Sequence, residues 1–134
     1  MLDLTTLTPK DEPADMEVTH PVTGEILVDE KGKPTVIHLW GRDSEKYRSE
    51  MRKRQNKRLS TASKRNQQSL NIEQIESDSL EVLVAATAGW DNVVWEGQKL
   101  DPTPENIRKV YKSLPWLMDQ VDQFVNTREN FFQN

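Results

Sequence analysis

Two histidines and one pair of aspartates are the side chains of this sequence best suited to acid–base chemistry. Asp119 and Asp122 stand three residues apart, so a helix would place both carboxylates on one face, as a glycosidase requires. Acidic side chains near a helix N-terminus more often complement the helix dipole. His20 lies beside a turn, and His38 lies in the apolar run 36–40, where a lone histidine is usually structural. We therefore expect no catalytic residue among these four.

The motifs that carry enzyme and metal chemistry are missing from the sequence. It contains no cysteine, which excludes disulfides, thiolate metal ligands and a cysteine nucleophile. It also has no phosphate-binding P-loop, no glycine-rich dinucleotide loop, no HExxH zinc motif and no GxSxG nucleophile elbow. These observations predict a protein that is not an enzyme and that has no cofactor and no metal site.

The sharpest charge feature is a basic segment between two acidic ones. The 134-residue chain has a net charge of −4, yet residues 46–65 hold nine Lys and Arg against one acid. A basic helix can bind the phosphate backbone of a nucleic acid. Here the whole chain is acidic, and Tyr47 is the one aromatic residue in the basic stretch. We therefore expect this segment to bind an acidic protein surface, with nucleic acid as the less favoured alternative.

Four tryptophans supply the second kind of candidate contact. Large aromatic side chains stabilise small cores, and they also dominate protein-binding hot spots. Trp90 and Trp116 fit the core best, whereas Trp95 stands in a loop beside Gly97 and is expected to be partly exposed. The candidate partner-binding residues are Arg48, Arg52, Arg54, Lys57, Arg58 and Trp95.

The N-terminal third predicts a small β-sheet that follows a mobile tail. Residues 1–15 are polar and show no periodicity. Residues 16–42 are expected to form a three-stranded β-meander, because three β-prone runs are separated by turns. These runs are 16–20, 25–28 and 35–40. Three strands are near the minimum for independent stability, so the sheet is expected to lean on a helix or a partner.

The remaining sequence predicts helices. Residues 43–69 are expected to form a basic connecting helix and a linker, because they are rich in helix formers with few apolar positions. Residues 70–134 hold three helical patterns, one of them opened by Thr103 and Pro104. We therefore predict an α+β protein with a C-terminal three-helix domain that carries a Trp-bearing loop and folds on its own.

No segment is expected to cross a membrane or to direct secretion. The longest apolar stretch, 82–88, is far too short to span a bilayer. Residues 1–15 have neither the basic start nor the apolar run of a signal peptide. The lack of cysteine fits a reducing cytoplasm.

Four stretches follow one another in a distinctive order. They are GRDSEKYR (41–48), GWDNV (89–93), PTPENIRKVY (102–111) and PWLMDQVDQFVNTRENFF (115–132). A helix leads to GW, and a short acidic hairpin, a TPEN helix and a PW helix ending in R-x-N-F follow. In this order the chain resembles the tail assembly chaperones of long-tailed (siphovirus-type) bacteriophages, over about residues 16–134. The shared motifs are structural, not catalytic.

The resemblance implies a protein that acts in the host cell cytoplasm and is absent from the mature virion. Members of that family bind the phage tape measure protein, keep its helices soluble and help to recruit tail tube protein. The same two partners are therefore expected here, and a homo-oligomer remains open. Two alternatives also remain. One is a structural tail or neck protein that stays in the virion, and the other is a nucleic-acid-binding regulator that uses residues 46–65.

Overall fold

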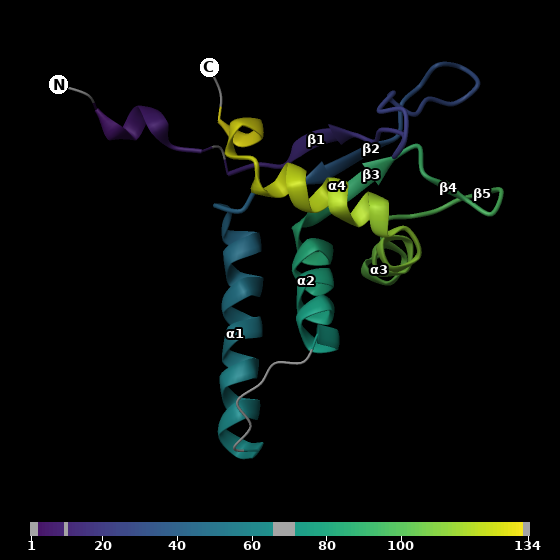
Figure 1. The fold of residues 1–134 in the computed structure, drawn as a ribbon. Helices are drawn as coiled ribbons and strands as arrows, with labels where there is room; N and C mark the ends of the chain where they lie inside the picture. Colours follow the sequence, from purple (N-terminus) through teal and green to yellow (C-terminus); the bar gives the residue numbers. More distant parts are fainter. Residues whose placement is uncertain (1–2, 10, 66–71, 133–134) are drawn as a thin grey trace.

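A computed structural model describes residues 3–9, 11–65 and 72–132 of the chain (Figure 1). The predicted α+β class is confirmed: a three-stranded antiparallel sheet, a long basic helix and a helical C-terminal half. In the described residues the α-helices are α1 (Glu45–Arg65), α2 (Ile72–Ala86), α3 (Pro104–Ser113) and α4 (Pro115–Asn126). Two short 3-10 helices, η1 (Leu4–Leu7) and η2 (Arg128–Phe131), lie near the chain ends. None of these helices is long and apolar enough to span a bilayer.

The sheet is built from strands that are far apart in the sequence. Its order is β1 (Ala14–Glu17), β2 (Val36–Leu39) and β3 (Thr87–Asp91), with both pairs antiparallel. The predicted three-stranded antiparallel sheet is confirmed, but run 25–28, predicted as its middle strand, lies outside it, and β3 completes the sheet. That run makes only isolated bridges, Thr19 with Ile26 and Val28 with Pro34.

Burial explains why β3 and not residues 25–28 completes the sheet. Ile26 and Val28 are exposed, and Leu27 between them is only partly buried against the core, so the run buries little apolar surface. Strand β3 buries Thr87 and Trp90, and Trp90 lies opposite Ile37 of β2. Helix α2 ends at Ala86 and passes directly into β3, so the helix predicted to continue to Gly89 stops one turn earlier.

Local signals set the starts of the other helices. The Ser44 hydroxyl accepts a hydrogen bond from the Tyr47 backbone N–H at 3.2 Å and caps α1. Thr103 caps α3 in the same way by accepting from the Asn106 N–H at 3.2 Å, and Pro104 occupies the first turn. Pro115 opens α4. The predicted Trp-bearing loop is a hairpin of β4 (Val94–Trp95) and β5 (Gln98–Lys99).

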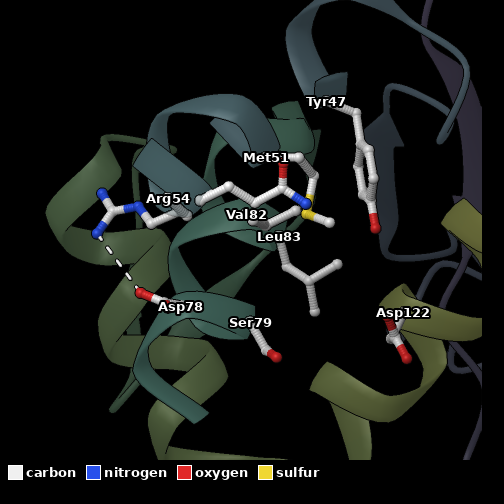
Figure 2. A pocket seen from close by; sticks show the side chains of 9 residues that line it. Tyr47, Met51, Arg54, Asp78, Ser79, Val82, Leu83 and Asp122 are labelled. Carbon is white, nitrogen blue, oxygen red and sulfur yellow. Dashed lines mark ion pairs between the residues drawn. The ribbon is translucent and has the colours of Figure 1, made fainter. Parts of the chain in front are cut away.

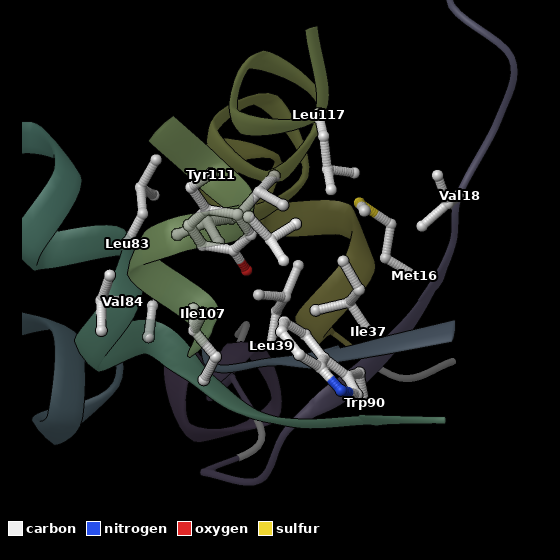
Figure 3. Packing of buried hydrophobic residues seen from close by; sticks show 14 of the residues in the cluster. Met16, Val18, Ile37, Leu39, Leu83, Val84, Trp90, Ile107, Tyr111 and Leu117 are labelled. Atoms are coloured by element: carbon white, nitrogen blue, oxygen red, sulfur yellow. The ribbon is translucent and has the colours of Figure 1, made fainter. Parts of the chain in front are cut away.

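The core lies between one face of the sheet and helices α2, α3 and α4. Burial alternates along strand β2: Ile37 and Leu39 are buried, whereas Val36 and His38 are only partly buried. Figure 3 shows Ile37 and Leu39 on the side of the sheet where Tyr111 and the helices lie. Burying such side chains contributes about 25 cal/mol for each Å² of apolar surface removed from water.

Tyr111 of α3 ties this core to the junction of α2 and β3. The Thr87 hydroxyl donates to the Leu83 carbonyl at 2.8 Å, so the Tyr111 hydroxyl donates to the Thr87 oxygen at 2.6 Å. Burial raises the pKa of Tyr111 well above its ordinary value. The phenol therefore stays neutral and acts as a fixed donor at the point where the chain leaves α2.

The C-terminal turn closes over the start of the connecting helix. Arg128 of η2 binds the Asp43 carboxylate with two hydrogen bonds of 2.8 and 3.2 Å. This guanidinium holds the pKa of the Asp43 carboxyl below its usual value. Gly41 lies directly under the Phe131 ring, where an added Cβ would stand 2.7 Å from two ring carbons. The first and last stretches of the resemblance thus meet in the fold.

The predicted boundary at residue 70 divides a shared core. Met16, Ile37 and Leu39 come from the N-terminal side of that boundary, and they pack in one cluster with Tyr111 and Val121 from the other. Strand β3 also takes its only sheet partner, β2, from the N-terminal side. The predicted boundary itself has not been tested.

We expect a fragment of residues 70–134 to lose the cooperative thermal transition of the full chain. Without β1 and β2 the apolar faces of α2, α3 and α4 are exposed and β3 has no strand to pair with. Thermal unfolding followed by circular dichroism measures whether the transition is cooperative. A fragment of residues 11–134 is the matched control, because η1 contains no buried residue, and it should melt like the full chain. A sharp thermal transition for residues 70–134 alone would instead support the prediction that this C-terminal domain folds on its own.

Candidate protein-binding site

Helix α1 presents most of the predicted basic residues to solvent. Arg48, Arg52 and Lys57 are exposed. Arg52 forms an exposed ion pair with Glu45 at 2.7 Å, which leaves the net positive charge of the helix in place. Arg58 lies in α1, but its side chain is outside the described residues. Three of the predicted basic residues are thus placed where a partner can reach them.

Arg54 lies on a different side of α1 from the exposed cations, and its role in partner binding stays a prediction. Its side chain is 19% exposed and approaches Glu50 at 3.2 Å and Asp78 of α2 at 4.0 Å (Figure 2). Arg54 falls in the stripe that contains Tyr47 and Met51, and that stripe lines the contact with α2. The guanidinium thus lies between Glu50 of α1 and Asp78 of α2 and contributes a cation to the contact between the two helices.

Trp95 lines an apolar cavity of about 220 Å³ at the other end of the molecule. The walls come from segments far apart in the sequence, and the lining side chains include Leu27, Trp90, Val94, Trp95, Leu114 and Trp116. The Trp90 indole N–H donates to the Leu100 carbonyl at 2.8 Å, which fixes that wall. Apolar cavities of about 150 Å³ hold a benzene ring, so this one has room for one large apolar side chain.

Val94 stands at the mouth of this cavity and was missed by the sequence-based prediction. It lines the cavity and is nevertheless 59% exposed. The apolar run 93–95 inside a predicted loop was a usable signal, because exposed apolar side chains in a loop often mark a contact. Trp116, assigned to the core, is only half-buried and also lines the cavity.

The predicted residues do not form one site. Figure 1 shows α1 and the β4–β5 hairpin on opposite sides of α2. The exposed cations Arg48, Arg52 and Lys57 lie on α1, whereas Trp95 lies in the hairpin. The molecule therefore offers two separate surfaces, one basic and one apolar.

His38 lies between two carboxylates. Its Nδ1 is 2.6 Å from the Asp15 carboxylate, and its Nε2 is 3.0 Å from the Asp91 carboxylate. Burial lowers the pKa of His38, but the hydrogen bonds to Asp15 and Asp91 outweigh burial and raise the pKa above its usual value. When the ring is protonated, each nitrogen donates to one of these carboxylates, and the cation then joins β1, β2 and β3.

Among the residues that the structure describes, no group of three or more His, Asp or Glu side chains is arranged to hold a metal ion. Asp119 and Asp122 are both in α4. Asp122 borders the groove between α1 and α2 and accepts a hydrogen bond from the Asn126 amide at 3.0 Å.

Comparison with known proteins gives no relative: no family model, no curated protein and no solved structure matches this chain.

Replacing Arg54 by Ala should destabilise the protein by about 1–3 kcal/mol, because the two largely buried carboxylates of Glu50 and Asp78 lose a cation. Lys53→Ala is the matched control, since Lys53 is an exposed neighbour on the same helix and should change stability by less than about 0.5 kcal/mol. Urea unfolding of both variants measures the difference. Equal stability of the two variants would show that Arg54 contributes nothing to the α1–α2 contact.

The His38 cluster should make stability depend on pH. Because its pKa is higher in the folded than in the unfolded chain, its contribution is complete below about pH 6.5, the unfolded value. The contribution is lost as the pH rises through the folded-state pKa. Urea unfolding from pH 5.5 to 8.5 should therefore show stability falling across this window, and His38→Gln should flatten that fall. An unchanged pH profile in His38→Gln would assign the dependence to other groups.

Proposed function

We propose that this protein is a phage tail assembly chaperone that transiently binds the tape measure and tail tube proteins during tail morphogenesis. In this proposal the protein acts in the host cell cytoplasm and dissociates before the virion is complete. It starts from the four stretches that resemble this family. Two of them touch in the fold, through Arg128 with Asp43 and Phe131 with Gly41. That contact gives these motif residues a physical reason to occur together.

The observation that carries the proposal is the open apolar cavity beside Trp95. A protein that keeps helices of another chain soluble must cover their apolar side chains, and it must release them later. A cavity with room for one large side chain, with Val94 exposed at its mouth, suits such a limited and reversible contact. A large side chain of the partner buried in such a cavity would act as an anchor, and a few anchors of this kind usually carry most of the binding energy of a protein interface.

The basic surface of α1 supports the same proposal in a different way. Exposed cations such as Arg48 and Lys57 contribute little to stability, but they raise the rate at which an acidic partner is captured. Reversal of Arg48 and Lys57 to Glu should therefore slow association more than it speeds dissociation. Arg54 is left unchanged in such a variant because its contact with Asp78 of α2 would change stability as well as binding.

Two experiments separate this proposal from its alternatives. Mass spectrometry of purified virions should not detect the chain, whereas a structural tail or neck protein would be present at a fixed copy number. A nucleic-acid-binding regulator would bind duplex DNA with an affinity that falls steeply with salt, by about 0.9 in logarithmic slope for each phosphate contacted. We expect no such binding at about 150 mM salt.

Val94→Glu should weaken binding to the tape measure protein encoded in the same phage genome by at least about tenfold, because it places a charge at the mouth of the cavity. Val22→Glu is the matched control: Val22 is 86% exposed in a turn outside the cavity lining. Binding is measured with co-expressed, purified proteins by surface plasmon resonance.

Both variants should melt within a few degrees of the wild type, since each changes an exposed side chain. Binding that is equally strong in wild type, Val94→Glu and Val22→Glu would remove the cavity from the proposal. Failure of the wild type to bind the tape measure protein at all would remove the chaperone function itself.

A further inference from the structure

The α1–α2 helix pair leaves an apolar face uncovered by the described residues. Met51 and Leu59 of α1 are 39% and 70% exposed, and Ile72 and Ile75 of α2 are 73% and 42% exposed. Four large apolar side chains on two adjoining helices are more than the scattered apolar residues of an ordinary surface. None of these four side chains lines the Trp95 cavity.

Spacing places these side chains on the same side of the pair as the groove in Figure 2. Met51 and Gln55 of α1 and Ser79 and Val82 of α2 line that groove, which has a volume of about 170 Å³. On α1, Leu59 follows Gln55 by four residues. On α2, Ile75 precedes Ser79 by four residues. Residues three or four apart are neighbours on a helix surface, so Met51, Leu59, Ile72 and Ile75 form a stripe of apolar side chains that continues from this groove. The groove itself is mixed in character, because the charged side chains of Arg54, Asp78 and Asp122 also line it.

The two edges of this stripe carry opposite charge. Arg48 and Arg52 stand one turn from Met51 and Gln55 along the outer edge of α1, and both are exposed. Glu76 is exposed on α2, one turn from Ile72 and Ser79. The imbalance extends over the whole pair: α1 holds nine Lys and Arg with two Glu, whereas α2 holds four acids and no base.

We propose that this face binds a second copy of the chain about a two-fold axis, with α1 of each copy lying along α2 of the other. A two-fold contact uses the same patch on both copies, so it pairs the basic edge with the acidic edge twice. The apolar stripes then meet in the centre of a four-helix arrangement. A uniformly acidic partner helix fits less well, because it would meet Glu76 as a like charge. The inference shares Arg48 with the basic surface of α1 but uses none of the residues that line the Trp95 cavity, and it does not depend on the proposed function.

The test reverses one charge on the basic edge of the stripe, or one charge on its acidic edge, in the full-length chain. Wild-type protein should sediment as a dimer at about 50 µM in low salt. Arg52→Glu and Glu76→Arg should each weaken self-association by at least about tenfold, since each places two like-charge contacts in the symmetric interface. An equimolar mixture of the two variants should dimerise again, because in the mixed pair both contacts join opposite charges. Lys53→Glu changes the same charge on the other side of α1 and should leave the dimer intact.

Sedimentation velocity gives the mass of each sample, and circular dichroism establishes that all variants are folded. A monomeric wild type at this concentration overturns the inference, whichever partner then occupies the face. Two variants that each remain monomeric and stay monomeric when mixed also overturn it, because they show that charge pairing across the two edges does not hold the copies together. Tape measure binding is scored separately with Val94→Glu, so a failure here leaves the chaperone proposal standing.

Discussion

The pairing of β3 with β2 is the constraint on which the rest of the structure depends. Strand β3 begins where α2 ends, so its pairing fixes α2 against the sheet. Tyr111 then holds α3 to the same junction through its hydrogen bond to Thr87. A long crossing from β2 through α1 and α2 to β3 makes this a non-local contact, and the loop-closure entropy it costs must be offset by the shared core.

The helices could be predicted from the sequence because their signals are local. Thr103 with Pro104, and Pro115, start α3 and α4 where expected, and the apolar spacing of α4 places Val121 and Val125 in the core. Strand β3 could not be predicted in this way. Its sequence TAGWD has a glycine and no alternation, and it becomes a strand because β2 is available beside it.

The two candidate surfaces differ in how far sequence could define them. Exposure of Arg48 and Arg52 follows from the charge pattern, but Arg54 fell in the gap of the apolar stripe that contains Tyr47 and Met51. Helical spacing therefore predicts that Arg54 faces α2. A count of positive charges does not distinguish Arg54 from the exposed cations of the same helix. Trp95 was expected to be partly exposed and is half-buried. The cavity beside it could not be foreseen, because its walls come from segments that only the tertiary fold brings together.

The separation of the two surfaces has a consequence for binding. If α1 and α2 join two copies, the Trp95 cavity of each copy stays open, because the β4–β5 hairpin lies on the far side of α2 (Figure 1). The dimer then offers two weak apolar sites held at a fixed separation. A long helical partner with repeated apolar positions can occupy both, and the second contact becomes intramolecular. Affinity then rises without a larger interface, and each single contact remains weak enough to be released when the partner finds its place in an assembly.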